Sequence, residues 1–546
     1  MKPRRLMLVA VVGACAFVLA VVASLNIPGQ RGWRLVLAQY VFLLPSIAAF
    51  LWAQRDSADV ASGAKLPSIK TLLLFCFVVS LPFAWWGNRA TSSADESAYH
   101  FQARTLASGR LTAASPATTE PVDNARRTEF FFIHHIIARG QWFGKYPPGW
   151  PALLAVGHLL GIEWLLNPLL GLVLLWLTYK IGSTCFDETV ARGAALMLLL
   201  SPMFLVNCVG YYSHVFCGVL LAAATLFCIE SLRNERKRDH LLMFILLGIA
   251  LLVRPFTAFC FTMVLTLASF AWAWPRKKRL LWIFGAGCVG ASIAFYGLAA
   301  YNLALTGDPL HSTYAMYRGS TSIAEINYQP ASVLKNLRVI TSRSLLNTTL
   351  AIFPFMFLLA LRALFRRQEA TTEARLLCIL FVVLVLGHAL QTEPSDTVVG
   401  ERYYFEALFA VAILAARGWS LLVRRRRFSK VAVSTVGIAI LLVQLLHFAL
   451  FSYDTYRRKI PFARMRAVVT SGDAERHDAV IFMKDNKRFR PADFNLNDVN
   501  WRQSPHFYLP DPGAQRRDAV TRALGRSKWF VFSYENEEVR LEAQSG

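Results

Sequence analysis

The sequence predicts an all-α polytopic membrane protein of about thirteen transmembrane helices, with a small C-terminal α/β domain outside the membrane. Of the 546 residues, 55% are hydrophobic and 17% are charged, and the mean hydropathy is +0.41. The hydrophobic residues stand in long runs, and a membrane helix needs about 20 of them. This composition excludes a disordered chain and an ordinary soluble enzyme.

The chain is strongly basic, with a net charge of +24 from 58 Lys and Arg against 34 Asp and Glu. In a soluble protein this excess would indicate nucleic-acid binding. Here the basic residues cluster in short loops between apolar runs, which is the positive-inside pattern of membrane proteins. We therefore expect membrane lipids as partners and no nucleic acid. The nine Cys lie in or beside apolar runs, with neither disulfide nor zinc-site spacing.

The basic loops define the expected topology. The apolar run that follows the basic N-terminus is too long for a signal-peptide core, so we interpret it as an uncleaved first helix with its start in the cytoplasm. Four basic loops are expected on the same side, near residues 233–238, 276–279, 362–367 and 424–430. The expected spans lie near residues 6–24, 34–53, 69–87, 165–182, 191–209, 213–231, 240–255, 257–274, 280–302, 346–365, 375–390, 403–423 and 431–452.

Residues 147–161 are apolar, but counting them as a span would break this alternation. We expect a short re-entrant or interfacial helix there; the alternative is that a neighbouring segment does not span. The predicted domains are 1–452, a transmembrane domain whose first external loop covers roughly 88–148, and 453–546, an external α/β domain. The tail has short β-like runs at 479–483, 507–509 and 529–533 and a helical run at 515–524.

Two adjacent acids, Asp95 and Glu96, lie just beyond the third expected span. Carboxylates at a membrane surface can act as a base or bind a cation. The alternative is an ordinary helix start, because Ser92 and Ser93 precede the amphipathic stretch 97–107. The sequence leaves both interpretations open.

Three cations stand at the outer ends of expected spans. Lys145 precedes two prolines and an apolar helix, so it can hold a phosphate or extend to lipid headgroups. Arg254 lies at a helix break, where it needs an anionic partner, either a substrate or a nearby carboxylate or headgroup. Arg402 can bind a phosphate or pair with Glu401 or Glu406. Acids beside cations at headgroup level suit a reaction on a lipid-linked phosphate.

Other polar clusters carry less information. We expect His134–His135, Tyr211–His214 and Tyr314–Arg318 to be interfacial belt residues, since Tyr and His are common there. No Walker A, GxGxxG, GxSxG or HExxH motif is present.

Several of these motifs, in this order, resemble the GT-C glycosyltransferases that use polyprenyl-phosphate sugars, the group of the protein O-mannosyltransferases and lipid A aminoarabinose transferases. The residues that carry the resemblance extend over roughly 69–425 and include the acidic pair with its helix. They are Asp95–Tyr99, Arg104–Gly109, Lys145–Pro148, Asn167–Arg192, Leu252–Pro255 and Arg402–Tyr403. The chain departs from the pattern in its two leading spans, in Ala98, which stands where some relatives have a basic residue, and in its tail domain.

The resemblance implies a GT-C fold and assigns site residues. Asp95, with Glu96 beside it, would be the catalytic acid pair, and Lys145, Arg254 and Arg402 would bind the donor phosphate. Six neighbouring side chains would contact donor or acceptor: Tyr99, His100, Arg104, Tyr146, His214 and Tyr403.

We therefore expect an inverting transfer of a sugar from a polyprenyl-phosphate donor to an acceptor hydroxyl on the outer face of a bacterial inner membrane. The acceptor is open, as is metal dependence, because Asp95 and Glu96 could hold a divalent cation or the basic residues could replace one. No other cofactor is expected. The rival functions are a transporter or flippase of an anionic polyprenyl lipid, which should show broken mid-membrane helices or repeats, and a non-catalytic scaffold.

Overall fold

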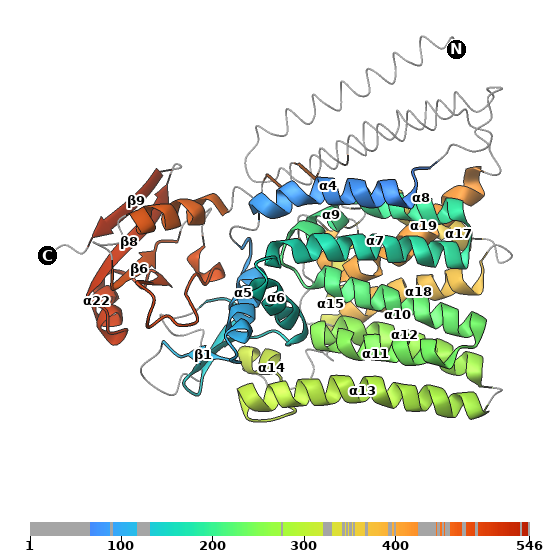
Figure 1. Cartoon of the computed structure of the whole chain (residues 1–546), viewed down its shortest axis with the longest axis horizontal. Helices are drawn as coiled ribbons and strands as arrows, with labels where there is room; N and C mark the ends of the chain where they lie inside the picture. The colour runs from blue at the N-terminus through green and yellow to red at the C-terminus, as the bar shows by residue number, and fades with distance from the viewer. Residues whose placement is uncertain are drawn as a thin grey trace, which may run out of the picture.

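A computed structural model gives the architecture (Figure 1). The residues that it describes are 66–87, 91–116, 132–274, 277–319, 330–340, 355–365, 370–390, 396–397, 400–423, 459–471, 477–485, 490–535 and 538–543, with isolated positions at 344–345, 348, 352, 444, 448–449 and 452–453. The two spans expected before residue 54 and most of the one at 431–452 lie outside them.

Long helices run side by side and form the larger part of the molecule (Figure 1). Six of them in the described residues are long and apolar enough to cross a membrane: Ile69–Trp86, Glu163–Cys185, His214–Asn234, Pro255–Ala273, Lys277–Thr306 and Arg402–Leu422. Glu188–Leu199 and Pro202–Val209 would form one more if the 64° bend between them lies within a single span. All seven fall on predicted spans, which confirms a helical membrane architecture; the total of thirteen stays a prediction.

Two further predicted spans coincide with shorter helices. The spans expected at 240–255 and 375–390 are α11 (Lys237–Val253) and α18 (Thr372–His388), each of 17 residues. At 1.5 Å per residue they are about 25 Å long, slightly less than a hydrocarbon core. The remaining bundle elements are α4 (Ile69–Gly87), η3 (Glu163–Leu165), α7 (Leu166–Cys185), α8 (Glu188–Leu199), α9 (Pro202–Val209), α10 (His214–Asn234), α12 (Pro255–Ala273), α13 (Lys277–Thr306), α15 (Pro330–Val339), α17 (Met356–Leu364), η5 (Arg402–Ala407) and α19 (Leu408–Val423).

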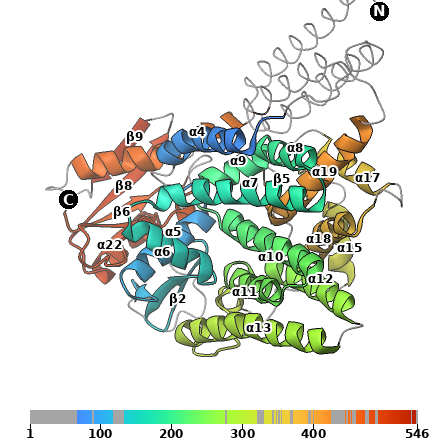
Figure 2. The same ribbon diagram turned by 45° about the vertical axis from the view of Figure 1, so that its right-hand side comes forward.

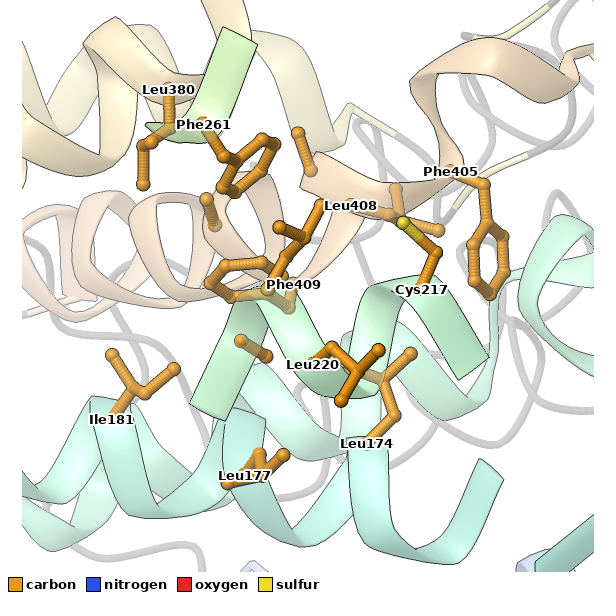
Figure 3. Packing of buried hydrophobic residues seen from close by; sticks show 14 of the residues in the cluster. Leu174, Leu177, Ile181, Cys217, Leu220, Phe261, Leu380, Phe405, Leu408 and Phe409 are labelled. Carbon is orange, nitrogen blue, oxygen red and sulfur yellow. The ribbon is translucent and has the colours of Figure 1, made fainter. Parts of the chain in front are cut away.

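The core of the bundle lies between α7, α10, α12, α18 and α19. Side chains such as Leu174, Leu220, Phe261, Leu380 and Phe409 from these five helices pack together there and are fully or almost fully buried (Figure 3). The peripheral helices instead expose apolar side chains, among them Leu74 and Val78 of α4, and Leu281, Phe284 and Phe295 of α13. A helix that is apolar all round and exposed on one side suits contact with lipid.

The segment between α4 and η3, here called the α5–α6 segment, packs on one end of this bundle (Figures 1 and 2). It begins with α5 (Ala94–Ala107), continues into a small antiparallel sheet of order β1-β3-β2, and ends in α6, which has 11 residues. A helix of that length is too short to cross a membrane, as expected for 147–161. The strands are β1 (Ala113–Ala114), β2 (His135–Ala138) and β3 (Gln141–Gly144), and α6 is Gly149–Leu159.

The tail forms a four-stranded sheet of order β7-β6-β8-β9 beside α5 and β1 (Figure 1). Strand β6 pairs in parallel with β7 and β8, whereas β9 is antiparallel to β8. The β-like and helical runs of the sequence fall on β6, β7, β8 and α22; the extent of the domain stays a prediction. Its elements are β6 (Ala479–Met483), η6 (Pro491–Asp493), β7 (His506–Pro510), α22 (Ala514–Ala523), β8 (Lys528–Glu535) and β9 (Glu538–Ala543), with a further helix at 459–471. Outside the tail, β4 (Asp396–Thr397) and β5 (Gly400–Glu401) pair and α14 spans Thr313–Arg318.

Charged residues from the basic loops and the candidate site residues lie at opposite ends of the bundle. At the end away from α5, residues of the basic loops pair with acids. Arg279 pairs with Glu235, and Arg233 Nη2 lies 2.7 Å from Glu373 Oε1. The start of α10, the break between α11 and α12 and the start of η5 lie at the other end, because Ser213 and Arg402 contact α5 and Arg254 contacts Ser213. Candidate site residues and basic loops are thus separated by the length of the helices.

Candidate active site

Helix α5 places Asp95 in its first turn. The Ser93 side chain accepts a hydrogen bond from the Glu96 backbone N–H at 3.3 Å, so the serine caps the helix as one interpretation of the sequence expected. Asp95 is not the cap, and its carboxylate is therefore available for contacts with other elements. An acid in this first turn is also stabilised by the helix dipole.

The Asp95 carboxylate lies among groups from three distant segments. Arg402 Nη1 donates to its Oδ2 at 2.9 Å, the Tyr146 hydroxyl donates to its Oδ1, and His134 Nε2 is 3.7 Å from Oδ1. Burial alone would raise the pKa of the Asp95 carboxyl. The positive charges of Arg402 and Lys145 and the Tyr146 hydrogen bond overcome burial and hold that pKa well below its usual range. The acid is therefore ionised at neutral pH.

Lys145 is surrounded by aromatic rings close to Asp95. Its Nζ lies 5.3 Å from the ring centre of Tyr146, 5.0 Å from that of Tyr314 and 4.9 Å from that of Tyr317. Rings at these distances attract an ammonium group through cation–π interactions. Tyr317 also accepts a hydrogen bond from the His134 N–H at 3.3 Å. Sequence reasoning assigned His134 and these two tyrosines to an interfacial belt, and it lacked any signal that α14 folds back onto Lys145.

Backbone contacts fix the turn that carries Lys145 and Tyr146. Gln102 of α5 donates to the Tyr146 carbonyl at 2.8 Å and to the Tyr301 hydroxyl at 2.7 Å. Thr313 donates to the Lys145 carbonyl at 2.7 Å. Helices α5, α13 and α14 thus hold one short turn, and this orients both side chains.

Arg254 belongs to a second, buried ion cluster. Its Nε lies 2.9 Å from Oε1 of Glu406, which is 0% exposed, and His214 Nδ1 is also 2.9 Å from that oxygen. Arg254 donates to Ser213 at 3.3 Å, and Ser213 shares a 3.0 Å hydrogen bond with Tyr99. The sequence had offered Glu406 as a partner of Arg402. The structure corrects this: Glu406 pairs with Arg254, and Asp95 pairs with Arg402.

The Tyr403 ring connects the two clusters. The guanidinium carbons of Arg254 and Arg402 lie 5.5 Å and 5.6 Å from its centre, and His388 stacks on it at 4.7 Å with an interplanar angle of 6°. Tyr99 stands against Tyr146 with ring centres 4.2 Å apart. Of the residues proposed from the sequence, Asp95, Lys145, Arg254 and Arg402 are therefore connected through Tyr99, Tyr146, His214 and Tyr403.

Glu96 faces a different direction from Asp95. Its Oε2 accepts from the Ser92 N–H and hydroxyl, both at 2.6 Å, and its Oε1 accepts from the Tyr211 N–H at 2.8 Å. Gly210 lies against the same carboxylate, and a Cβ there would approach Oε1 to 2.8 Å. These buried contacts tie α5 to the loop before α10. They do not bring Glu96 to Asp95 as a pair.

The structure also places His100 and Arg104 outside the Asp95 cluster. The His100 ring packs on Tyr211 at 4.1 Å, and burial lowers its pKa to about 3. Arg104, one turn later on the same face, lies among groups that include Arg466 and Asp498 of the tail. Neighbours three to four residues apart share a helix face, so both residues point toward the tail.

No group of three or more His, Cys, Asp and Glu side chains that could hold a metal occurs among the residues that the structure describes. The carboxylates of Asp95 and Glu96, suggested as cation ligands, bond to different partners and do not share one position. Within the described part, a two-carboxylate metal site is thus not formed by this pair.

The charges around Asp95 and His134 predict that the activity does not fall as the pH is lowered from neutral to about 5. Burial, with the nearby Lys145 charge, lowers the pKa of His134 to about 3, and the pKa of Asp95 is lowered too. Neither group therefore takes up a proton between about pH 7 and pH 5, so we expect kcat/KM per folded enzyme to change less than about two-fold in that interval. The measurement is the pH dependence of kcat/KM. An acid limb near pH 6.5 that His134→Asn removes would contradict it.

Residues 147–296 match the family model described as dolichyl-phosphate-mannose-protein mannosyltransferase. The fold matches a crystal structure of ArnT from Cupriavidus metallidurans bound to undecaprenyl phosphate, with a TM-score of 0.54 and 14% identity over 87% of this chain and 97% of that chain. The chain has the GT-C glycosyltransferase fold. The apo form of the same ArnT matches with a TM-score of 0.51 and 14% identity over 86% of this chain and 94% of that one.

The archaeal oligosaccharyltransferase AglB from Archaeoglobus fulgidus, in complex with an inhibitory peptide and a dolichol-phosphate, is a more distant match. Its TM-score is 0.47, with 11% identity over 85% of this chain and 69% of that chain. No curated protein sequence matches the chain. The family match over residues 147–296 and the shared fold confirm the resemblance to GT-C glycosyltransferases, and they support the prediction that the chain is an enzyme.

Proposed function

We propose that this GT-C protein transfers a sugar from a polyprenyl-phosphate donor to an acceptor hydroxyl, with inversion at the sugar C1. The observation that carries the proposal is the Asp95 cluster: an ionised carboxylate 2.9 Å from Arg402, beside Lys145 in its aromatic surroundings. One acid next to two cations suits an acceptor that loses a proton and a phosphate that leaves with negative charge. The undecaprenyl phosphate named for the ArnT structure supports a lipid-linked donor.

In the proposed step, the acceptor oxygen attacks C1 from the face opposite the phosphate. The C1–O bond to the polyprenyl phosphate breaks, its electron pair stays on the phosphate oxygen, and the acceptor proton passes to Asp95. A carboxylate with a lowered pKa is a weak base, so its main contribution is to orient the hydroxyl and take the proton as the new bond forms. Lys145 and Arg402 stabilise the departing phosphate.

Glu96 and Arg254 take positioning roles in this proposal. Glu96 holds the start of α5 through Ser92 and Tyr211, and so fixes the direction of Asp95. Arg254 is neutralised by Glu406 and supports the Tyr403 ring against which Arg402 lies. Removing one partner of such a buried ion pair leaves the other charge uncompensated, which is costly. This favours a structural role for Arg254 over direct binding of the donor phosphate.

The decisive experiment uses the purified protein, a radiolabelled polyprenyl-phosphate sugar and candidate lipid, glycan or protein acceptors. We expect free polyprenyl phosphate and glycosylated acceptor in equal amounts, with inverted anomeric configuration. If no donor is cleaved, while donor moves across the bilayer of vesicles that contain the protein, the flippase alternative is correct.

We place the site on the outer face of a bacterial inner membrane, because it lies at the end opposite the basic loops. A single cysteine at Ser115 is then expected to react with an impermeant thiol reagent in intact spheroplasts. A cysteine at Asn234 should react only after the membrane is opened. Both belong in a background without the native cysteines. The reverse labelling pattern would put Asp95 in the cytoplasm and contradict the lipid-linked donor.

A further inference from the structure

The tail and the α5–α6 segment share one hydrophobic core. One buried cluster contains side chains from both parts. The α5–α6 segment contributes Phe101 of α5, Trp142 of β3 and also Phe132, which precedes β2, and the tail contributes side chains such as Phe507 of β7 and Met465. The Trp142 and Phe507 rings lie 6.2 Å apart. The tail is therefore packed against the segment that supplies the site, and the two do not have separate cores.

Three buried or half-buried hydrogen bonds join them, all from one tail segment, Pro491–Trp501. The Asn495 N–H donates to Ser97 Oγ at 2.7 Å, and Ser97 follows Asp95 by two residues. The Ala492 carbonyl accepts from the Ile133 N–H at 2.7 Å, directly before His134. Trp501 Nε1 donates to the Ala114 carbonyl at 3.0 Å.

The third bond reaches the turn at Lys145 through the sheet. Ala114 of β1 pairs with Gln141 of β3, and β3 ends at Gly144, directly before Lys145. Each of the three hydrogen bonds therefore holds a segment that carries a different site residue: Asp95, His134 or Lys145.

Side chains within the tail make this segment rigid. Asn497 donates to the Tyr508 carbonyl and accepts from the Tyr508 N–H, both at 2.8 Å, so it pairs with β7 as a neighbouring strand would. The Asn495 side-chain carbonyl accepts from the Asn497 N–H at 3.1 Å. Asn495 and Asn497 are both buried. The tail sheet and the three hydrogen bonds thus form a continuous support.

We propose that the tail segment Pro491–Trp501 is a positioning element of the active site, which holds α5 and the β2–β3 turn so that Asp95, His134 and Lys145 keep their mutual geometry. The inference rests on the proposed function for its catalytic consequence. A small displacement of a catalytic group lowers the rate strongly while substrate binding elsewhere persists.

The test uses two substitutions that remove one anchoring bond each, in the full-length protein. Ser97→Ala removes the acceptor of the Asn495 N–H, and Trp501→Phe removes the donor to Ala114 but keeps the ring. Matched controls are Ser183→Ala, near the end of α7, where the hydroxyl donates to the Lys180 carbonyl at 3.0 Å, and Trp529→Phe, in the tail, where the indole donates to Asp518 at 2.6 Å.

We expect Ser97→Ala and Trp501→Phe to lower kcat about ten-fold, with KM for the donor unchanged within about two-fold, and the controls to stay near wild type. Hydrogen exchange, read independently of activity, should be faster in the peptides covering α5 and residues 132–146. If turnover per folded enzyme and this exchange match those of the controls while only the melting temperature falls, the tail merely stabilises the protein. If the wild-type protein shows no transferase activity but the two variants still exchange faster as predicted, the proposed function is refuted and the positioning role of the tail segment is not.

Discussion

Asp95→Asn should reduce glycosyl transfer by about 100-fold or more while the protein still folds and inserts. The asparagine keeps the size of the side chain and can still accept the hydrogen bond from Arg402 through its carbonyl oxygen. It cannot take the acceptor proton, and its lack of charge leaves the positive charges of Arg402 and Lys145 without compensation. The measurement is the initial rate of polyprenyl-phosphate release at saturating donor, per amount of monodisperse protein.

Asp187→Asn is the matched control. Asp187 caps α8 at the opposite end of the bundle, where its Oδ1 accepts from the Val190 N–H at 2.9 Å, and asparagine is an equally good cap. We expect wild-type turnover for this variant. If Asp95→Asn also kept wild-type turnover, Asp95 would not be the proton acceptor, and Glu96 would have to be tested in that role.

Lys145→Ala should weaken use of the donor far more than it weakens folding. The ammonium group is held by three aromatic rings beside Asp95, so in our proposal its loss removes a charge-assisted contact to the donor phosphate. Such contacts contribute about 1.5–3 kcal/mol, which corresponds to a rise of about 10- to 150-fold in KM for the donor. KM for the acceptor should not change. Steady-state kinetics with both substrates varied gives the two values.

Lys237→Ala provides the comparison for Lys145→Ala, because Lys237 Nζ also contacts an aromatic ring, that of Trp282 at 5.5 Å, but at the other end of the helices. Its kinetics should match wild type. An unchanged donor KM for Lys145→Ala would leave Lys145 as a headgroup contact, the alternative that its sequence position had suggested.

The spans and the order of the motifs were predictable because they depend on local properties. Hydropathy over about 20 residues identifies a helix that can cross a membrane, wherever it packs. For residues 147–161 the sequence left two alternatives, a short helix or a neighbouring segment that does not span, and the structure has the 11-residue helix α6 there. Lys145 with its two prolines could likewise be found from its position at a helix start.

The direction of neighbouring side chains was not predictable from the sequence. Asp95 and Glu96 are adjacent, but successive residues of an α-helix point about 100° apart. One carboxylate therefore reaches Arg402 and Tyr146, and the other reaches Ser92 and the Tyr211 backbone. His100 and Arg104 follow on a face that packs on Tyr211 and the tail, so their closeness to Asp95 in the sequence does not bring them to its carboxylate.

The sequence by itself determined that this is a helical membrane protein, where its apolar helices lie, and that two adjacent acids and three cations stand at their ends. Only the tertiary structure decided how these charges pair. Arg402 meets Asp95 across 307 positions of the chain, Glu406 meets His214 across 192, and Asn495 reaches Ser97 across 398. The local sequence shows that a charged residue lies near lipid and therefore needs a partner. Which residue becomes that partner depends on the packing of helices that are distant in sequence.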